Sequence, residues 1–311
     1  MTTEPIVATR DVPVVLSRRW GVSAVVADYW AMTKPEVNFL IVITTGAGFY
    51  LASAAELSRF PWITFLNTLL GTLLTASGAA ALNQWMEYPF DAKMRRTARR
   101  AIAAGRVDPF HALTFGVTLS LAGVAYLTLT AGVLASLLAF VTLISYLLLY
   151  TPLKQVTPLC TLVGAVPGAA PPLVGWAAAR GHLDPGAWLL FAIVFLWQFP
   201  HFMSIAWMYR DDYERAGYVV LPDGVTRDRF VSAQTLLPLF VLLVVSLLPV
   251  HGGPPRLAYC SGTLVLGIGF LCCGLRFTRQ RSRSSARRLL MASIIYLPAA
   301  LALIILLAPR G

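Results

Sequence analysis

Residues 60–100 read FPWITFLNTLLGTLLTASGAAALNQWMEYPFDAKMRRTARR and contain the two features that decide the fold of this 311-residue chain. The stretch Phe60–Leu82 carries no charged side chain and is long enough, as a helix, to cross a hydrocarbon core of roughly 30 Å. Acidic and basic side chains follow at once. The stretch therefore predicts a transmembrane helix that ends in charged groups at one membrane face.

Apolar stretches of this length recur along almost the whole chain. Hydrophobic residues make up 57% of it and charged residues only 13%, and the mean hydropathy is +0.69, a composition that belongs in lipid. We predict an all-α polytopic membrane protein with nine transmembrane helices. Their approximate limits are Val37–Ala54, Phe60–Leu82, Pro109–Leu129, Ala131–Tyr150, Thr157–Ala179, Gly186–Tyr209, Val231–Val250, Leu257–Leu275 and Leu289–Ala308.

The distribution of basic residues predicts the orientation in the membrane. When loops are assigned to alternate sides, 21 of the 25 Lys and Arg residues fall on the side of the amino terminus. The positive-inside rule then places the amino terminus in the cytoplasm and the carboxyl terminus across a bacterial-type inner membrane. We predict a cytoplasmic tail over 1–36 and one transmembrane domain over 37–309. The net charge of +11 is explained by this orientation and by lipid headgroups, without nucleic acid as a partner.

A row of oxygen-bearing side chains follows the second predicted span. Asn83, Glu87 and Asp91 are spaced four residues apart, so on a helix they share one face. Such ligands suit Mg²⁺, which substrate phosphates commonly complete, and a diphosphate is the natural partner. Pro89 lies within the motif and should kink or loosen the helix. The alternative is that both carboxylates are ordinary charges at headgroup level.

A second acidic cluster follows the sixth predicted span. Asp211 and Asp212 lie in YRDDYERAG, where they either bind a second Mg²⁺ across a shared pocket or belong to a solvated loop. Arg96 and Arg100 are one turn apart if the helix continues past the first motif, and Lys154 is isolated in an uncharged loop. These three could hold phosphate oxygens, or could serve only as orientation signals.

One histidine lies inside a predicted span. His201 belongs to the segment WQFPHF, where an imidazole is either hydrogen-bonded packing or a functional ligand.

Four segments carry a resemblance to a known family: YWAMTKPEVNFL (29–40), NQWMEYPFDAKMRRTARR (83–100), YTPLKQVTPLCTLVGAVPGAAPPLVGW (150–176) and WQFPHFMSIAWMYRDDYERAGYVVLP (197–222). They resemble the haem O synthases, or protohaem IX farnesyltransferases, of the UbiA superfamily of intramembrane prenyltransferases. The first acidic motif marks the superfamily, and the third and fourth segments resemble the haem branch.

This resemblance implies nine helices around a central cavity and an enzyme that binds farnesyl diphosphate through Mg²⁺. The farnesyl group would pass to a vinyl group of haem B, a substrate rather than a cofactor, and water would complete the product. A haem A synthase is a plausible downstream partner. The implied site residues are Asn83, Glu87, Asp91, Asp211 and Asp212 for catalysis, with Asn83, Glu87, Asp91 and Asp212 as Mg²⁺ ligands, and Arg96, Arg100, Lys154, Lys34 and His201 for substrate binding.

The chain departs from the family pattern at two positions. Glu87 stands where many bacterial relatives have Asp, which changes the reach of that ligand. Ala216 stands four residues after Asp212, where the superfamily's second motif has an acid, and this leaves the number of metal ions open.

Two other functions are compatible with the same composition. A UbiA-type transferase could act on a quinone precursor or a chlorophyll-like acceptor. A secondary transporter would also show many spans and broken helices, but its coupling groups generally lie near the membrane midplane, whereas these acids cluster at one face.

Overall fold

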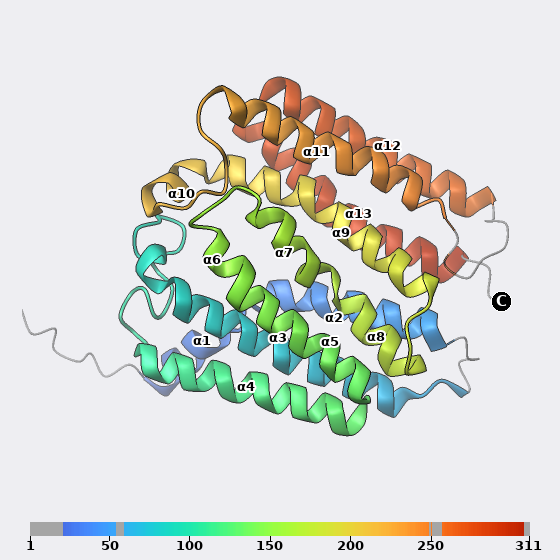
Figure 1. Cartoon of the computed structure of the whole chain (residues 1–311), viewed down its shortest axis with the longest axis horizontal. Helices are drawn as coiled ribbons and strands as arrows, with labels where there is room; N and C mark the ends of the chain where they lie inside the picture. Colours follow the sequence, from blue (N-terminus) through green and yellow to red (C-terminus); the bar gives the residue numbers. More distant parts are fainter. Residues whose placement is uncertain (1–20, 54–58, 249, 251–256, 308–311) are drawn as a thin grey trace, which may run out of the picture.

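The computed structural model describes residues 21–53, 59–248, 250 and 257–307, and these form helices joined by turns and loops (Figure 1). The helices are α1 Val22–Met32, α2 Pro35–Ser53, α3 Trp62–Asp91, α4 Pro109–Thr130, α5 Val133–Ile144, the π-helical segment η2 Ser145–Tyr150, α6 Thr151–Leu153, α7 Cys160–Ala169, α8 Pro171–Arg180, α9 Pro185–Met208, α10 Arg210–Ala216, α11 Val225–Val245, α12 Leu257–Gln280 and α13 Arg283–Leu307.

The predicted number of spans is confirmed within the described residues. Nine helical stretches are long and apolar enough to cross a membrane, among them the continuous run Val133–Leu153 and the run Cys160–Arg180. The second span is longer than predicted, because α3 continues past Leu82 through the whole first motif to Asp91. Pro89 lies inside this helix, which ends two residues later at Asp91, and the kink expected at Pro89 stays a prediction.

The amino-terminal boundary also differs from the sequence-based limits. The described part of the predicted tail contains α1, and α2 begins at Pro35, two residues before the predicted start of the first span. A short turn at Thr33 and Lys34 joins the two helices.

Close backbone contact between helices fixes the position of α3 and α2. A Cβ atom at Gly78 of α3 would lie 2.2 Å from Oγ of Ser120 on α4, and one at Gly175 of α8 would lie 1.9 Å from the Thr45 carbonyl oxygen on α2. Small residues at such contacts let helices approach closely, as in other membrane bundles. The motif-bearing helix α3 is therefore held firmly against its neighbours.

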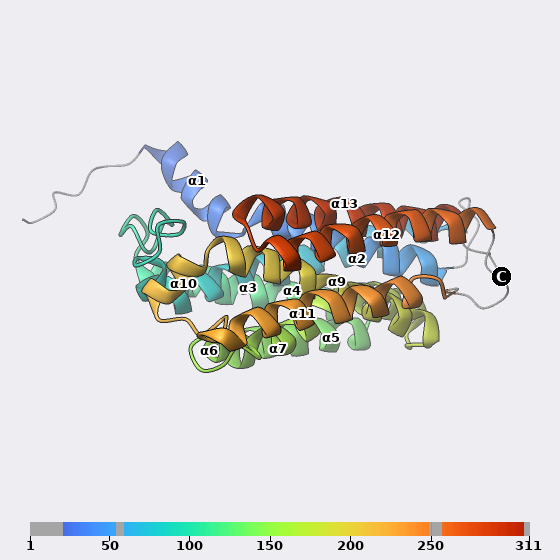
Figure 2. The same ribbon diagram turned by 90° about the horizontal axis from the view of Figure 1, so that it is seen from above.

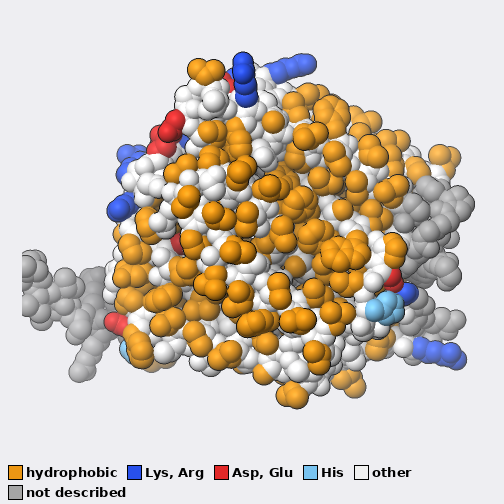
Figure 3. Space-filling model, in the orientation of Figure 1, with side chains coloured by type: hydrophobic (Ala, Val, Ile, Leu, Met, Phe, Trp, Pro, Cys, Tyr) orange, Lys and Arg blue, Asp and Glu red, His pale blue; other side chains and the backbone are white. Residues whose placement is uncertain are grey.

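Charged segments gather at one end of the bundle. Figures 1 and 2 place α1, the loop 92–108 and α10 at the same end of the long axis. The two acidic motifs therefore lie at the same end, as predicted. Figure 3 shows a face covered by hydrophobic side chains, with charged groups mostly at its margins. With the nine apolar helices found in the described part of the chain, this surface identifies a multi-pass membrane protein.

Candidate active site

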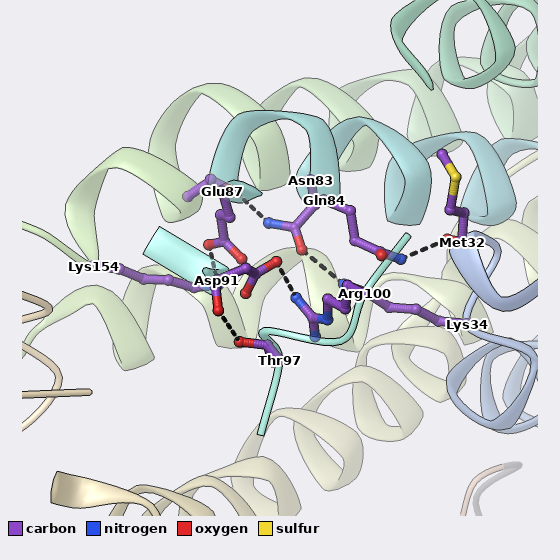
Figure 4. Close-up of polar contacts among 10 residues, drawn as sticks. Met32, Lys34, Asn83, Gln84, Glu87, Asp91, Thr97, Arg100 and Lys154 are labelled. Atoms are coloured by element: carbon purple, nitrogen blue, oxygen red, sulfur yellow. Dashed lines mark hydrogen bonds and ion pairs between the residues drawn. The ribbon is translucent and has the colours of Figure 1, made fainter. Parts of the chain in front are cut away.

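The first acidic motif forms a buried polar row on the last turns of α3. Asn83, Glu87 and Asp91 retain 1%, 5% and 1% of their accessible surface. Figure 4 shows their side chains directed into one shared space. The three side chains therefore share one face of the helix, as their four-residue spacing predicts. Burial of three such polar groups is costly unless each has a partner.

Each member of this row has a basic partner from a different part of the chain. The Lys34 ammonium donates to Oδ1 of Asn83 at 2.7 Å. Lys154 Nζ lies 2.7 Å from Oε1 of Glu87. A guanidinium nitrogen of Arg100 lies 2.7 Å from Oδ2 of Asp91 (Figure 4). Three cations thus converge on three oxygen-bearing groups, and we name this arrangement the triad site.

Lys34 occupies a backbone conformation that is unusual for a residue other than glycine. Its φ is 53°, in the left-handed region, and its amide donates to the Ala31 carbonyl. Burial, with the nearby Arg100 charge second, lowers the pKa of Lys34 to about 7. Strained backbone and a destabilised charge at one residue are typical of a functional position.

Lys154 approaches from the opposite side of the row. It follows α6 directly, and its ammonium lies 4.4 Å from the centre of the Tyr150 ring. Just before it, Thr151 accepts a hydrogen bond from the Asn83 side-chain amide at 3.2 Å. The π-helical segment η2 precedes both residues, and such segments are frequent at functional sites. Sequence reasoning missed Thr151, because a threonine after an apolar run carries no signal.

The loop after α3 decides whether Arg96 and Arg100 share a helix face, which the sequence left open. Residues 92–107 form a series of turns, so Arg96 and Arg100 are not adjacent on a helix face. Arg100 turns back to Asp91, whereas Arg96 lies over the Tyr209 ring at 4.9 Å. Like charges four residues apart, including Arg95 and Arg99, disfavour helix here.

The triad site has donor groups that suit a divalent cation. Oδ1 of Asp91 is buried without a hydrogen-bond partner, although Oδ2 of the same carboxylate is paired. The described residues hold no cluster of three His, Cys, Asp or Glu side chains that could bind a metal alone. Carboxylate and amide oxygens are the donor types that Mg²⁺ accepts together with phosphate oxygens, and the role of Asn83, Glu87 and Asp91 as its ligands stays a prediction.

The two residues of the second acidic motif lie in different surroundings. Asp212 is buried and accepts hydrogen bonds from the Arg95 and Arg96 amides at 3.4 and 3.3 Å and from Arg215 at 2.8 Å. Burial acts to raise the pKa of Asp212, but these hydrogen bonds hold it below its usual range. Asp212 thus joins α10 to the loop after α3, and its role as a metal ligand stays a prediction.

Asp211 lies apart from the triad site. Its side chain is 78% exposed and pairs with Arg210 at 3.3 Å. The structure therefore does not bring it together with Asn83, Glu87 and Asp91.

His201 is half-buried on α9, and one of its ring nitrogens is hydrogen-bonded to another helix. Nδ1 lies 2.8 Å from Oγ of Ser293 on α13, and that hydroxyl donates to the Leu290 carbonyl. When the Ser293 hydroxyl donates to the Leu290 carbonyl, Nδ1 carries the ring proton that Oγ accepts, and in that tautomer Nε2 keeps its lone pair. The ring is stacked on Trp197 with centroids 4.8 Å apart.

A basic pocket adjoins the triad site. Its volume is about 300 Å³, and Lys34 and Arg100 contribute to its wall. The pocket is lined by Asp28, Ala31, Met32, Lys34, Gln84, Arg96, Arg99, Arg100, Ala101 and Arg106. Gln84 is a further residue that sequence reasoning missed: its amide donates to the Met32 carbonyl and connects α3 to the end of α1.

Comparison with known proteins assigns the class. Residues 40–297 match the UbiA prenyltransferase family, so the chain belongs to this family and is a prenyltransferase. Its relatives narrow the class further. The protoheme IX farnesyltransferase of Solibacter usitatus (strain Ellin6076) is 44% identical over 291 residues, which cover 91% of this chain and 99% of that protein. The mitochondrial protoheme IX farnesyltransferase of Homo sapiens is 38% identical, with coverage of 88% and 60%.

Solved structures support the fold. A structure of digeranylgeranylglyceryl phosphate synthase aligns over 90% of this chain and 97% of that chain, with a TM-score of 0.72 and 14% identity. A UbiA homologue from Archaeoglobus fulgidus, bound to GPP and Mg²⁺, aligns over 89% of this chain and 99% of that chain, with a TM-score of 0.57 and 13% identity. At these identities the likeness establishes the all-helical UbiA fold.

Proposed function

We propose that this chain is a protohaem IX farnesyltransferase, or haem O synthase. It transfers the farnesyl group of farnesyl diphosphate to a vinyl group of haem B, adds water and releases diphosphate. The names of relatives up to 44% identical support the acceptor. The observation that carries the proposal is the triad site, where three oxygen ligands of α3 face Lys34, Lys154 and Arg100. Such a site suits a metal diphosphate better than an uncharged solute.

Asn83, Glu87 and Asp91 are the residues that would hold Mg²⁺. The partnerless oxygen of Asp91 supports this assignment, as does the Mg²⁺ bound with GPP in the Archaeoglobus fulgidus relative. When bound, the ion neutralises negative charge on the diphosphate. Lys34 and Arg100 line the adjoining pocket and are placed to bind phosphate oxygens.

The reaction needs charge stabilisation rather than a nucleophilic side chain. The bond between farnesyl C1 and the diphosphate oxygen breaks, and both electrons leave with the diphosphate. The vinyl carbon then attacks C1, and water adds to the resulting cation and gives up a proton. Lys34, Lys154 and Arg100 stabilise the departing negative charge, and the burial of the site limits early capture of the farnesyl cation by water.

His201 is proposed to orient haem B. In the tautomer in which Nδ1 donates to Ser293, Nε2 keeps a lone pair, and a neutral imidazole nitrogen of this kind ligates haem iron. Stacking on Trp197 holds the ring in place.

The proposed location is a bacterial-type inner membrane with the triad site near the cytoplasmic face. The loop 92–108 and the α12–α13 junction carry most of the basic residues that the positive-inside rule assigns to that side. A haem A synthase that takes up haem O is the proposed downstream partner.

The test is a reaction of the purified protein with haem B, farnesyl diphosphate and Mg²⁺ in the presence of 4-hydroxybenzoate as a competing acceptor. Mass spectrometry of both acceptors should show haem O and unmodified 4-hydroxybenzoate. Prenylation of 4-hydroxybenzoate alone would refute the haem assignment and retain the family chemistry.

A further inference from the structure

An ion pair at the rim of the basic pocket joins two segments far apart in the sequence. Arg106 Nε lies 2.9 Å from Oδ2 of Asp28, and Arg106 Nη2 lies 2.7 Å from Oδ1, so the contact is bidentate. The two side chains are 25% and 17% exposed. Nη2 also donates to the Arg99 carbonyl at 3.1 Å. Bidentate arginine pairs fix geometry as well as charge.

The two partners of this pair belong to the segments that deliver cations to the triad site. Asp28 lies on α1, whose last residue, Met32, is fully buried and belongs to the same hydrophobic cluster as Ile102 and Val107 of the loop. Lys34 follows α1 after one turn. Arg106 closes the loop 92–107, which carries Arg100.

The pocket between these segments has an excess of positive charge. Four of its lining residues, Lys34, Arg96, Arg99 and Arg100, are basic and do not pair with Asp28, although Arg100 pairs with Asp91 of the triad site. The one acidic lining residue, Asp28, is already neutralised by Arg106. The ion pair therefore draws the two walls together without cancelling the charge that faces the pocket.

We propose that Asp28 and Arg106 are positioning residues for the diphosphate site. Their pair holds α1 against the loop 92–107 and so sets Lys34 and Arg100 at the distances at which they meet α3. Neither residue touches the triad site directly. The identity of the ligand as a prenyl diphosphate rests on the proposed function.

The test measures binding of farnesyl diphosphate with Mg²⁺ by calorimetry, without any acceptor. Asp28→Asn and Arg106→Gln are each expected to raise the dissociation constant about tenfold, since each removes a partly buried charged hydrogen-bond pair. The double variant should be no weaker than either single variant, because both remove the same contact. Equal affinity in all four proteins, or additive losses in the double variant, would overturn the proposal.

Arg106→Lys distinguishes a positioning role of Arg106 from a role of its positive charge alone. It also tests the proposal if Asp28→Asn or Arg106→Gln fails to fold. It keeps the positive charge but loses the bidentate fork, so a positioning role predicts weakened binding. Binding equal to that of the wild type would contradict it. Asp184→Asn is the matched control: it removes the 3.0 Å pair with Arg180, away from the pocket, and should leave the dissociation constant unchanged.

Two further readouts separate this inference from a general loss of structure and from the proposed function. The KM for haem B should stay within about twofold of wild type in the variants that raise the diphosphate dissociation constant. Equal losses toward both substrates would indicate global damage and overturn the positioning role. Wild-type protein that binds farnesyl diphosphate but never modifies haem would refute the proposed function. The comparison of dissociation constants would still decide whether Asp28 and Arg106 position the diphosphate site.

Discussion

Glu87 is a proposed Mg²⁺ ligand, and it is the motif residue at which the chain departs from the pattern of many bacterial relatives. Its carboxylate is buried and bonded to Lys154 at 2.7 Å. Glu87→Gln keeps a polar group of the same size but removes one negative charge from the proposed metal-binding row. We expect the Mg²⁺ concentration for half-maximal activity to rise about tenfold or more. A Mg²⁺ titration of prenyl transfer measures this, and an unchanged titration would exclude Glu87 as a ligand.

A substitution of His201 should change the binding of haem B without changing the binding of farnesyl diphosphate. Removal of its ring in His201→Ala should weaken haem B binding about tenfold and leave the KM for farnesyl diphosphate near its wild-type value. Optical titration with haem provides the affinity. The matched variant Ser293→Ala removes only the hydrogen bond to Nδ1 and should give a smaller loss. Wild-type haem affinity and turnover in His201→Ala would remove the proposed role.

Asp212 connects α10 to the loop after α3 through hydrogen bonds. Asp212→Asn weakens the contacts with Arg95, Arg96 and Arg215, and should lower the free energy of unfolding by about 1–2 kcal/mol. Asp211→Asn, at a 78% exposed neighbour, should change it by less than about 0.5 kcal/mol. Thermal unfolding in detergent compares the two. Equal effects would show that the docking contacts of Asp212 do not stabilise the fold.

The close contact between α2 and α8 depends on Gly175, which has no side chain. Gly175→Ala would place a Cβ atom 1.9 Å from the Thr45 carbonyl oxygen, and the helices would have to separate. We expect a loss of about 3 kcal/mol or more in unfolding free energy. Gly269 on α12 has open space around it, so Gly269→Ala is the matched control and should stay within about 1 kcal/mol of wild type. An equally mild Gly175→Ala would contradict this packing.

The sequence was sufficient for the number of spanning helices and for the first motif, but not for the helix α1 or for the partners of that motif. Apolar length gives the number of spans, and a four-residue spacing places Asn83, Glu87 and Asp91 on one face. Lys34 and Lys154 meet this face from 49 and 67 residues away, and no local pattern encodes such contacts. The sequence left open whether the helix continues past the first motif, because the repulsion of four clustered arginines opposes their favourable helix propensity.

The orientation of the whole molecule can be tested by labelling single cysteines. In a background without the four native cysteines, Ala104→Cys lies in the exposed loop after α3, and His182→Cys lies at an exposed site after α8. A membrane-impermeant thiol reagent added to intact cells should label only His182→Cys, because the basic loop faces the cytoplasm. The reverse labelling would invert the proposed topology.

The central claim is that one site binds the metal diphosphate and drives farnesyl transfer to haem. The most direct measurement follows haem O and released diphosphate together in wild type and in Asp91→Asn, with Mg²⁺ and with a chelator. We predict equal amounts of the two products from wild type with Mg²⁺, and at least about a hundredfold less from the variant or after chelation. Haem O formation that survives both the substitution and the chelator would contradict the account.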